Sequence, residues 1–276
     1  MTIVSRLAAL AVAGALVGGC SWFENDEVPI EDRSARQIFD DAQALLDDDE
    51  PVAAARMFDE VERLYPFSQL SKRAMIQSAF ASYSAGDVAS ARASASRFLD
   101  LYPSDVDSSY AQYLIALTYY DNIVDVGRDQ IGTQSALREL QEVVRRYPES
   151  DYARDARLKI DLTHNHLAGK EMTVGRYYLK RGHYGAAINR FKVVVEKYQT
   201  TSHIEEALHR IVEANLALGL EREARISAAV LQENFPGSEW YAASFALLEG
   251  RDVRGERDTG GFFSRAYRRV ILGEWL

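Results

Sequence analysis

Cysteine is almost absent from this chain. Its 276 residues include one, Cys20, so no disulfide within the chain can stabilise it. Stability must come from a packed core, for which 47% apolar residues are ample material. Basic residues are also outnumbered, with 32 Lys and Arg against 41 Asp and Glu and a formal net charge of -9. Because nucleic-acid binding relies on clustered Lys and Arg, we expect no nucleic-acid partner.

The sequence also lacks common enzyme and zinc-site motifs. No G-x-S-x-G, H-E-x-x-H, glycine-rich phosphate loop or paired-cysteine pattern occurs. His164 and His166 are two residues apart, so on a helix they point to different sides. The acidic run Asp47–Glu50 before Pro51 is typical of a helix start, where Asp can cap the helix. We expect no enzyme activity, metal or cofactor; a hydrolase using scattered carboxylates is the alternative, and converging acids in a deep pocket would favour it.

An apolar run near the amino terminus is too short to be a transmembrane anchor. Arg6 precedes apolar residues from Leu7 to Val17, and two glycines then lead to Cys20. The run has about half of the ~20 residues that a transmembrane helix needs. Its layout is that of a secretory signal peptide. We predict that residues 1–19 are removed and that residues 20–33 form a tether.

The end of this segment resembles the lipobox of bacterial lipoproteins. Val17, Gly18 and Gly19 precede Cys20, although the usual lipobox has Leu where Val17 stands. In lipoproteins the cysteine becomes the first mature residue and is acylated, and several acyl chains together give stable anchoring. The resemblance implies a covalent lipid such as palmitate on Cys20, inserted in membrane lipid. Ser21 follows, where Asp would imply inner-membrane retention, so the outer membrane is favoured, on its periplasmic face.

Five short motifs indicate an internal repeat: Tyr65-Pro66, Tyr102-Pro103, Tyr147-Pro148, Tyr198-Gln199 and Phe235-Pro236. The residue twelve positions before each Pro or Gln is always alanine: Ala54, Ala91, Ala136, Ala187 and Ala224. Apolar or small residues eight and five positions before share its helical face. Seventeen positions before stand Gly86, Gly182 and Gly219, which suit a left-handed turn between helices, whereas Asp49 and Ile131 replace that glycine in the first and third units.

A helix pair with a Gly turn, an Ala at the close crossing and a closing aromatic-Pro resembles the tetratricopeptide repeat. We predict an all-α solenoid of five such pairs over residues 34–249, with a capping helix at 238–249 and a concave surface for a partner. The expected units are 34–66, 70–103, 108–148, 151–199 and 202–236. An insertion at Ile123–Gly132 splits the third pair, and a long helix from about Tyr152 to Arg181 joins the third and fourth. The alternative is a helical bundle with chance register.

Charge and the carboxy-terminal residues give weaker indications. Residues 24–62 contain 14 acidic and 3 basic residues, whereas residues 151–199 contain 5 acidic and 10 basic ones. Such asymmetry can orient two different partners. Residues 250–276 are predicted to be a flexible linker and an amphipathic tail, with Phe262, Ala266, Arg269 and Val270 near one side. The tail is suited to a membrane surface or another protein, or alternatively to folding back on the solenoid.

Two stretches resemble the BamD family, the lipoproteins of the outer-membrane β-barrel assembly (BAM) machine. They are YPFSQLSKRA, between the first two units, and HLAGKEMTVGRYYLKRGHYGAAINRF in the fourth unit. The resemblance runs through nearly all of the mature chain. It implies a non-enzymatic scaffold that binds the POTRA region of BamA, other BAM lipoproteins and unfolded outer-membrane protein precursors, and promotes their insertion. The rival is another tetratricopeptide lipoprotein, such as a secretin pilotin or a peptidoglycan-enzyme adaptor.

The family's contacts can be carried over to matching residues. Its members contact substrate through the amino-terminal repeats, which implies a candidate substrate edge at Tyr65, Phe67, Ser68 and Leu70; the family often has an aromatic residue near Leu70. They contact BamA through the carboxy-terminal repeats, which implies candidate BamA contacts at Tyr178, Arg181 and Arg190. Arg190 is preferred, because a guanidinium can pair bidentately with a carboxylate. The alternatives are intramolecular: an ion pair for Arg190 and core packing for Tyr178.

Overall fold

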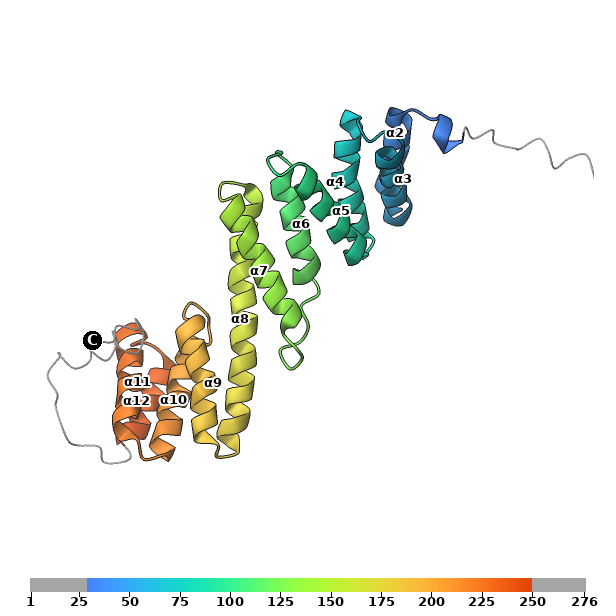
Figure 1. Cartoon of the computed structure of the whole chain (residues 1–276). Helices are drawn as coiled ribbons and strands as arrows, with labels where there is room; N and C mark the ends of the chain where they lie inside the picture. The colour runs from blue at the N-terminus through green and yellow to red at the C-terminus, as the bar shows by residue number, and fades with distance from the viewer. Residues whose placement is uncertain (1–28, 250–276) are drawn as a thin grey trace, which may run out of the picture. The chain divides into compact units, whose positions relative to one another are not determined.

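The computed structural model describes residues 29–249, which are helical throughout apart from turns and connections (Figure 1). No strand occurs in this part of the chain, so the predicted all-α fold is confirmed. The predicted signal peptide, Cys20, most of the predicted tether and residues 250–276 lie outside the described residues. None of the helices between residues 29 and 249 combines the length and the apolar character needed to span a bilayer.

The chain divides into two compact units, with the boundary between Ala74 and Met75. The first unit contains a 3-10 helix and two α-helices, followed by the start of α4: η1 Ile30–Asp32, α2 Ala35–Asp47, α3 Pro51–Leu64 and α4 Gln69–Ser84. The second unit contains the rest of α4 and eight further helices: α5 Val88–Leu101, α6 Ser108–Tyr120, α7 Ile131–Arg146, α8 Asp151–Lys180, α9 Tyr184–Lys197, α10 Ile204–Ala217, α11 Glu221–Asn234 and α12 Glu239–Glu249.

The repeated alanines lie at the packed side of the second helix of each pair. Each of the five has no exposed surface: Ala54, Ala91, Ala136, Ala187 and Ala224. The apolar residues seven positions later are equally buried: Val61, Phe98, Val143, Val194 and Leu231. A small residue lets the neighbouring helix approach, and the larger residue two turns on fills the space beside it. The repeat is therefore a packing repeat of the tetratricopeptide type, as predicted.

The turns between paired helices follow the predicted glycines. Gly86, Gly182 and Gly219 each have φ of 76°, and Asp49 has φ of 62°. Asp49 adopts this left-handed conformation because its short polar side chain tolerates it. The third pair is different: residues 121–130 connect α6 to α7, and Ile131 is the first residue of α7 rather than part of a turn. The acidic run before Pro51 does not cap α3 as expected, since Glu50 makes no side-chain capping bond.

Helix α8 has 30 residues and belongs to two helix pairs. Its amino-terminal half lies beside α7 and its carboxy-terminal half beside α9, as Figure 1 shows. Gly175 is buried at the crossing with α9, where a Cβ atom would overlap the ring of Phe191. Phe191 has no exposed surface and packs in one cluster with Met172 and Leu208. Tight packing thus fixes the helix that carries Tyr178 and that Arg181 directly follows.

Candidate interaction surfaces

The candidate substrate edge is a short turn between α3 and α4 in the first unit. Tyr65 closes α3, and its hydroxyl donates a hydrogen bond to the backbone carbonyl of Arg33, which lies 32 positions earlier. The Ser68 backbone N–H donates to the Tyr65 carbonyl at 2.9 Å, and the Leu70 N–H donates to the Ser68 hydroxyl oxygen at 3.2 Å. Leu70 is half-buried. Three of the four predicted residues thus hold the turn in shape.

Phe67, the fourth predicted residue, is 100% exposed at the tip of this turn. A phenyl ring in full contact with water loses the hydrophobic stabilisation that burial gives. The turn on either side of Phe67 is hydrogen-bonded. Little further conformational entropy is therefore lost when a partner covers the ring. This arrangement can hold an apolar side chain of another molecule against Phe67.

The candidate BamA contacts are all engaged within the chain. Tyr178 packs against the buried cluster of α8 to α11, and its ring lies 5.7 Å from that of Tyr177. The Arg181 guanidinium lies over the Tyr177 ring, 4.5 Å from the centroid. On α9, Arg190 pairs with Glu171 of α8 at 3.2 Å. The structure brings Tyr178 and Arg181 together around Tyr177, and it gives both Arg190 and Tyr178 the intramolecular contacts considered as alternatives.

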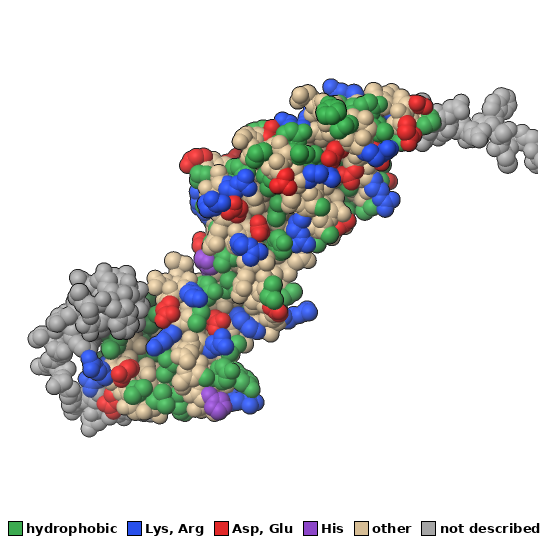
Figure 2. Space-filling view, in the orientation of Figure 1, with side chains coloured by type: hydrophobic (Ala, Val, Ile, Leu, Met, Phe, Trp, Pro, Cys, Tyr) green, Lys and Arg blue, Asp and Glu red, His purple; other side chains and the backbone are tan. Residues whose placement is uncertain are grey.

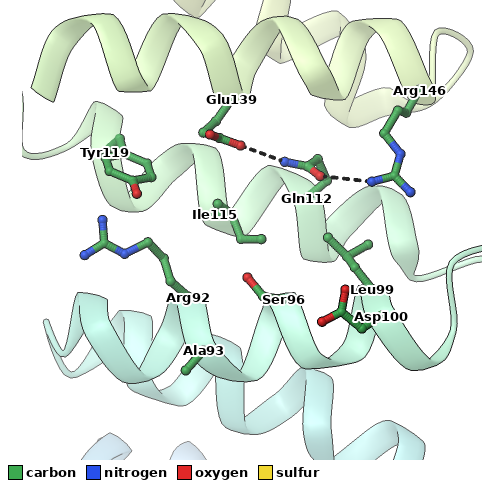
Figure 3. Close-up of a pocket in the computed structure, with 10 residues that line it drawn as sticks. All are labelled: Arg92, Ala93, Ser96, Leu99, Asp100, Gln112, Ile115, Tyr119, Glu139 and Arg146. Atoms are coloured by element: carbon green, nitrogen blue, oxygen red, sulfur yellow. Dashed lines mark hydrogen bonds between the residues drawn. The ribbon is translucent and has the colours of Figure 1, made fainter. Parts of the chain in front are cut away.

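A cavity of about 550 Å³ lies among α5, α6 and α7 and was missed from the sequence (Figure 3). The buried amide of Gln112 donates to the Glu139 carboxylate at 3.2 Å and accepts from Arg146 at 3.4 Å. On the α5 side the Arg92 guanidinium lies 4.4 Å from the centre of the Tyr119 ring. Figure 3 shows Asp100 and Glu139 on different walls of the cavity. A buried Gln within the apolar helix α6 was the available sequence signal.

A row of tyrosines on the first helices of successive pairs was also missed. The rings of Tyr110 and Tyr113 on α6 lie 5.2 and 5.3 Å from that of Tyr152 on α8. The Tyr113 hydroxyl donates to Asp155, and the Tyr83 hydroxyl on α4 donates to Asp121.

These tyrosines are half-buried and hold their protons tightly. Burial, and next the hydrogen bond to Asp121, raise the pKa of Tyr83 to about 12. Burial also raises the pKa values of Tyr110 and Tyr113. At neutral pH these residues therefore present uncharged, hydroxyl-tipped rings, which suit contacts with a polypeptide.

The histidines have separate structural environments. His164 contacts Tyr198, with the ring centroids 5.7 Å apart, and the buried Nε2 of His166 has no hydrogen-bond partner among the described residues. The His209 Nδ1 lies 2.9 Å from the Ser244 hydroxyl. Among residues 29–249, no three His, Asp, Glu or Cys side chains are grouped closely enough to hold a metal ion.

Basic and acidic side chains are interspersed on the visible face of the second unit in Figure 2. Ion pairs within and between neighbouring helices account for part of this mixture: Arg145–Glu142, Lys159–Asp155, Arg176–Glu206 and Arg210–Glu213. The excess of basic residues in 151–199 is therefore partly used to pair neighbouring acids, and it does not by itself mark a binding face.

Comparisons with known proteins agree with the resemblance seen in the sequence. Residues 31–231 match the YfiO family, described as "Outer membrane lipoprotein". The chain is 44% identical to outer membrane protein assembly factor BamD of Caulobacter vibrioides, over 90% of this chain and 81% of that protein. It is 38% identical to the same factor of Rickettsia prowazekii (90% and 98%) and 30% identical to that of Neisseria meningitidis (78% and 84%). The chain therefore belongs to the YfiO/BamD family of outer-membrane lipoproteins.

Proposed function

We propose that this protein is a non-enzymatic scaffold for the assembly of outer-membrane β-barrel proteins. The relatives from Caulobacter vibrioides and Rickettsia prowazekii are named outer membrane protein assembly factors, and they are similar to this chain over most of both chains. In this proposal a lipid on Cys20 holds the protein at the outer membrane, and its helix pairs bind unfolded precursors, BamA and other BAM lipoproteins. No cofactor takes part, because the work is noncovalent docking.

The observation that carries the proposal is the exposure of Phe67 on an ordered turn. Unfolded β-barrel precursors carry apolar side chains at alternate positions, and the exposure of these side chains to water is unfavourable. A fully exposed ring covers such a side chain without first breaking contacts of its own. Tyr65, Ser68 and Leu70 would then act as positioning residues, since their hydrogen bonds and packing shape the turn.

The cavity and the tyrosine row of the second unit support polypeptide binding separately. The cavity offers a stacked guanidinium at Arg92, a buried amide at Gln112 and the apolar wall of Ile115. An extended segment presents both backbone amides and side chains, so mixed polar and apolar walls suit it.

BamA binding is proposed for the face formed by α8 and α9. Among the described residues, Arg190 donates one N–H to Glu171, which leaves its other donors for a partner carboxylate. Its side chain is 46% exposed, so an approaching carboxylate can reach it. Arg181 is exposed as well, and its stacking on Tyr177 holds the guanidinium in place. Tyr178 would act through packing, because it supports this face from inside.

The precursor proposal is tested with matched substitutions in the first unit. Phe67→Ala is expected to weaken binding of a urea-diluted β-barrel precursor about tenfold, which is the loss of one well-placed aromatic contact. Val52→Ala is the control, since Val52 is also exposed (56%) but lies on α3 away from the turn. Binding is measured by fluorescence anisotropy, and circular dichroism verifies folding. Equal affinity for the Phe67 variant and the control would remove Phe67 from the substrate edge.

The alternative functions are distinguished by the proteins that co-purify with this one. A mild-detergent pull-down of the lipidated chain from its native envelope should recover BamA in stoichiometric amount; recovery of a secretin without BamA would favour a pilotin. A hydrolase is disfavoured by the cavity, because Asp100 and Glu139 stand on different walls and Glu139 accepts a hydrogen bond from Gln112.

A further inference from the structure

Helix α12 contacts both helices of the pair that precedes it, α10 and α11, with more of its contacts to α10. Helix α8, which begins the fourth unit, also contacts both helices of the pair before it, although mainly α7 and less α6. Among the described residues, α12 is a first helix without a second helix of its own.

The side of α12 that a second helix would cover is apolar. Only Ser244 is buried in this helix, while Phe245 is 49% and Leu247 39% exposed. Ala242, Ala243 and Ala246 are exposed beside them, and the charged residues of the helix are Glu239 and Glu249 at its ends. The last helix of a repeat array normally has a polar outer face. An apolar one indicates that another segment covers it.

The sequence that follows α12 repeats the phase of the second helices. In four pairs the residue with positive φ lies five positions before the crossing alanine: Asp49, Gly86, Gly182 and Gly219. Gly261 stands five positions before Ala266. Val270 follows Ala266 by four positions, as Phe191 follows Ala187.

On a helix, residues 262–271 divide into two faces. The apolar side comprises Phe262, Phe263, Ala266, Tyr267, Val270 and Ile271. The other side comprises Arg265 and Arg268, and Arg269 lies at the edge of the apolar side beside Phe262.

The connection between α12 and this segment is long enough for the chain to return. Residues 250–260 can span roughly 35 Å when extended, whereas α12 is about 16 Å long. The chain already contains a pair joined in this manner, since residues 121–130 connect α6 to α7.

We propose that residues 261–276 form the second helix of a sixth pair and cover the apolar face of α12. The basic side of this segment, rather than α12, then faces partners at this end of the protein. The occupant is a segment of the same chain, so the contact is independent of protein concentration and of lipid.

Hydrogen exchange tests this proposal on the full mature chain. Removal of residues 261–276 should make the amides of α12 exchange about tenfold faster, because a covering helix suppresses local opening. The amides of α9 should be unchanged, which shows that the rest of the unit is folded. Equal exchange in α12 with and without the segment would overturn the proposal.

Two matched substitutions in the full chain place the contact on one side of the segment. Val270→Gln should accelerate exchange in α12 several-fold, whereas Arg268→Gln, on the other side, should leave it unchanged. Equal effects of the two would contradict the proposed face. Protection that grows with protein concentration would identify a second copy as the occupant, and protection that requires phospholipid vesicles would identify lipid; either result overturns the proposal.

Discussion

The two candidate contact regions differ in how their residues are already used. At the turn between α3 and α4, Phe67 is wholly exposed while its neighbours hold the backbone in place. On α8 and α9, Tyr178 is packed against the core, and Arg190 is paired with Glu171. Substitution of Phe67 therefore removes a contact surface, whereas substitution of Tyr178 also removes packing against the core. A loss of BamA binding can be attributed to a lost contact only when the stability of the same variant is also measured.

The packing beneath the α8–α9 face should give the largest effect. Gly175→Ala places a Cβ atom into the ring of Phe191, which is buried on all sides. We expect a loss of about 2–3 kcal/mol in the free energy of unfolding, since the gain in helix propensity offsets only part of the overlap.

Gly169→Ala is the matched control in the same helix. Its Cβ atom would meet the His203 Nε2 at 3.4 Å, an ordinary contact. This variant should be unchanged or more stable by up to about 1 kcal/mol. Urea unfolding followed by circular dichroism measures the free energy of unfolding of both variants. Equal values would mean that the crossing at Gly175 can accommodate a Cβ atom.

A pair of aromatic truncations compares the two regions directly. Tyr178→Ala should lower the free energy of unfolding by about 1.5 kcal/mol, because a half-buried ring loses part of its packing. Phe67→Ala should change it by less than about 0.5 kcal/mol, because that ring is wholly exposed among the described residues. Thermal unfolding of the two variants measures this difference. If Phe67→Ala were the more destabilising, the turn would have contacts that the structure does not contain.

Lowering the pH should weaken the attachment of α12, with a smaller effect than the substitutions of Gly175 and Tyr178. Burial, and next the positive charge of Arg210, lower the pKa of His209, while Glu213 and Glu206 act in the opposite direction. The folded state therefore favours neutral His209, whose ring lies against Ser244 and Trp240 of α12.

The sign of the pH dependence follows from this lowered pKa. The stability contribution is complete above the unfolded value of about 6.5 and is lost as the pH falls through the folded value. Hydrogen exchange in α12, corrected for the intrinsic rate, should accelerate from pH 7 to pH 5 in the native chain. His209→Gln should remove most of this dependence, and a variant that retained it would point to another titrating group.

The fold was predictable because its signal is local and repeated. Each alanine lies on the second helix of its pair, and the closing aromatic residue caps the carboxy terminus of that helix, so counting positions was enough to identify the buried face. Asp49 was less clear from sequence, yet it takes the turn conformation of the glycines. Ile131 was misplaced because the insertion moved the start of α7, and no local pattern encodes where a long connection ends.

The contacts that shape the candidate surfaces were beyond sequence reasoning. Tyr65 meets Arg33 across 32 positions, and Tyr83 meets Asp121 across 38. Such pairs depend on which helix faces meet, and one sequence does not specify this. The same holds for Gln112, whose partners Glu139 and Arg146 both come from α7. The assignments of Phe67 and Arg190 to partners stay predictions.

A small effect on stability is also expected at Arg190, so a change in binding there can be attributed to a lost contact. Arg190→Ala should cost less than about 0.5 kcal/mol, because the ion pair with Glu171 is partly exposed and screened by solvent. Arg190→Glu places two carboxylates together and should weaken BamA binding further than the alanine variant does. The double variant Glu171→Arg/Arg190→Glu restores the internal pair but puts the guanidinium on α8. If a carboxylate of BamA contacts Arg190 itself, this exchange should recover stability without recovering affinity in a pull-down; recovery of both would mean that the ion pair matters only for the shape of the face.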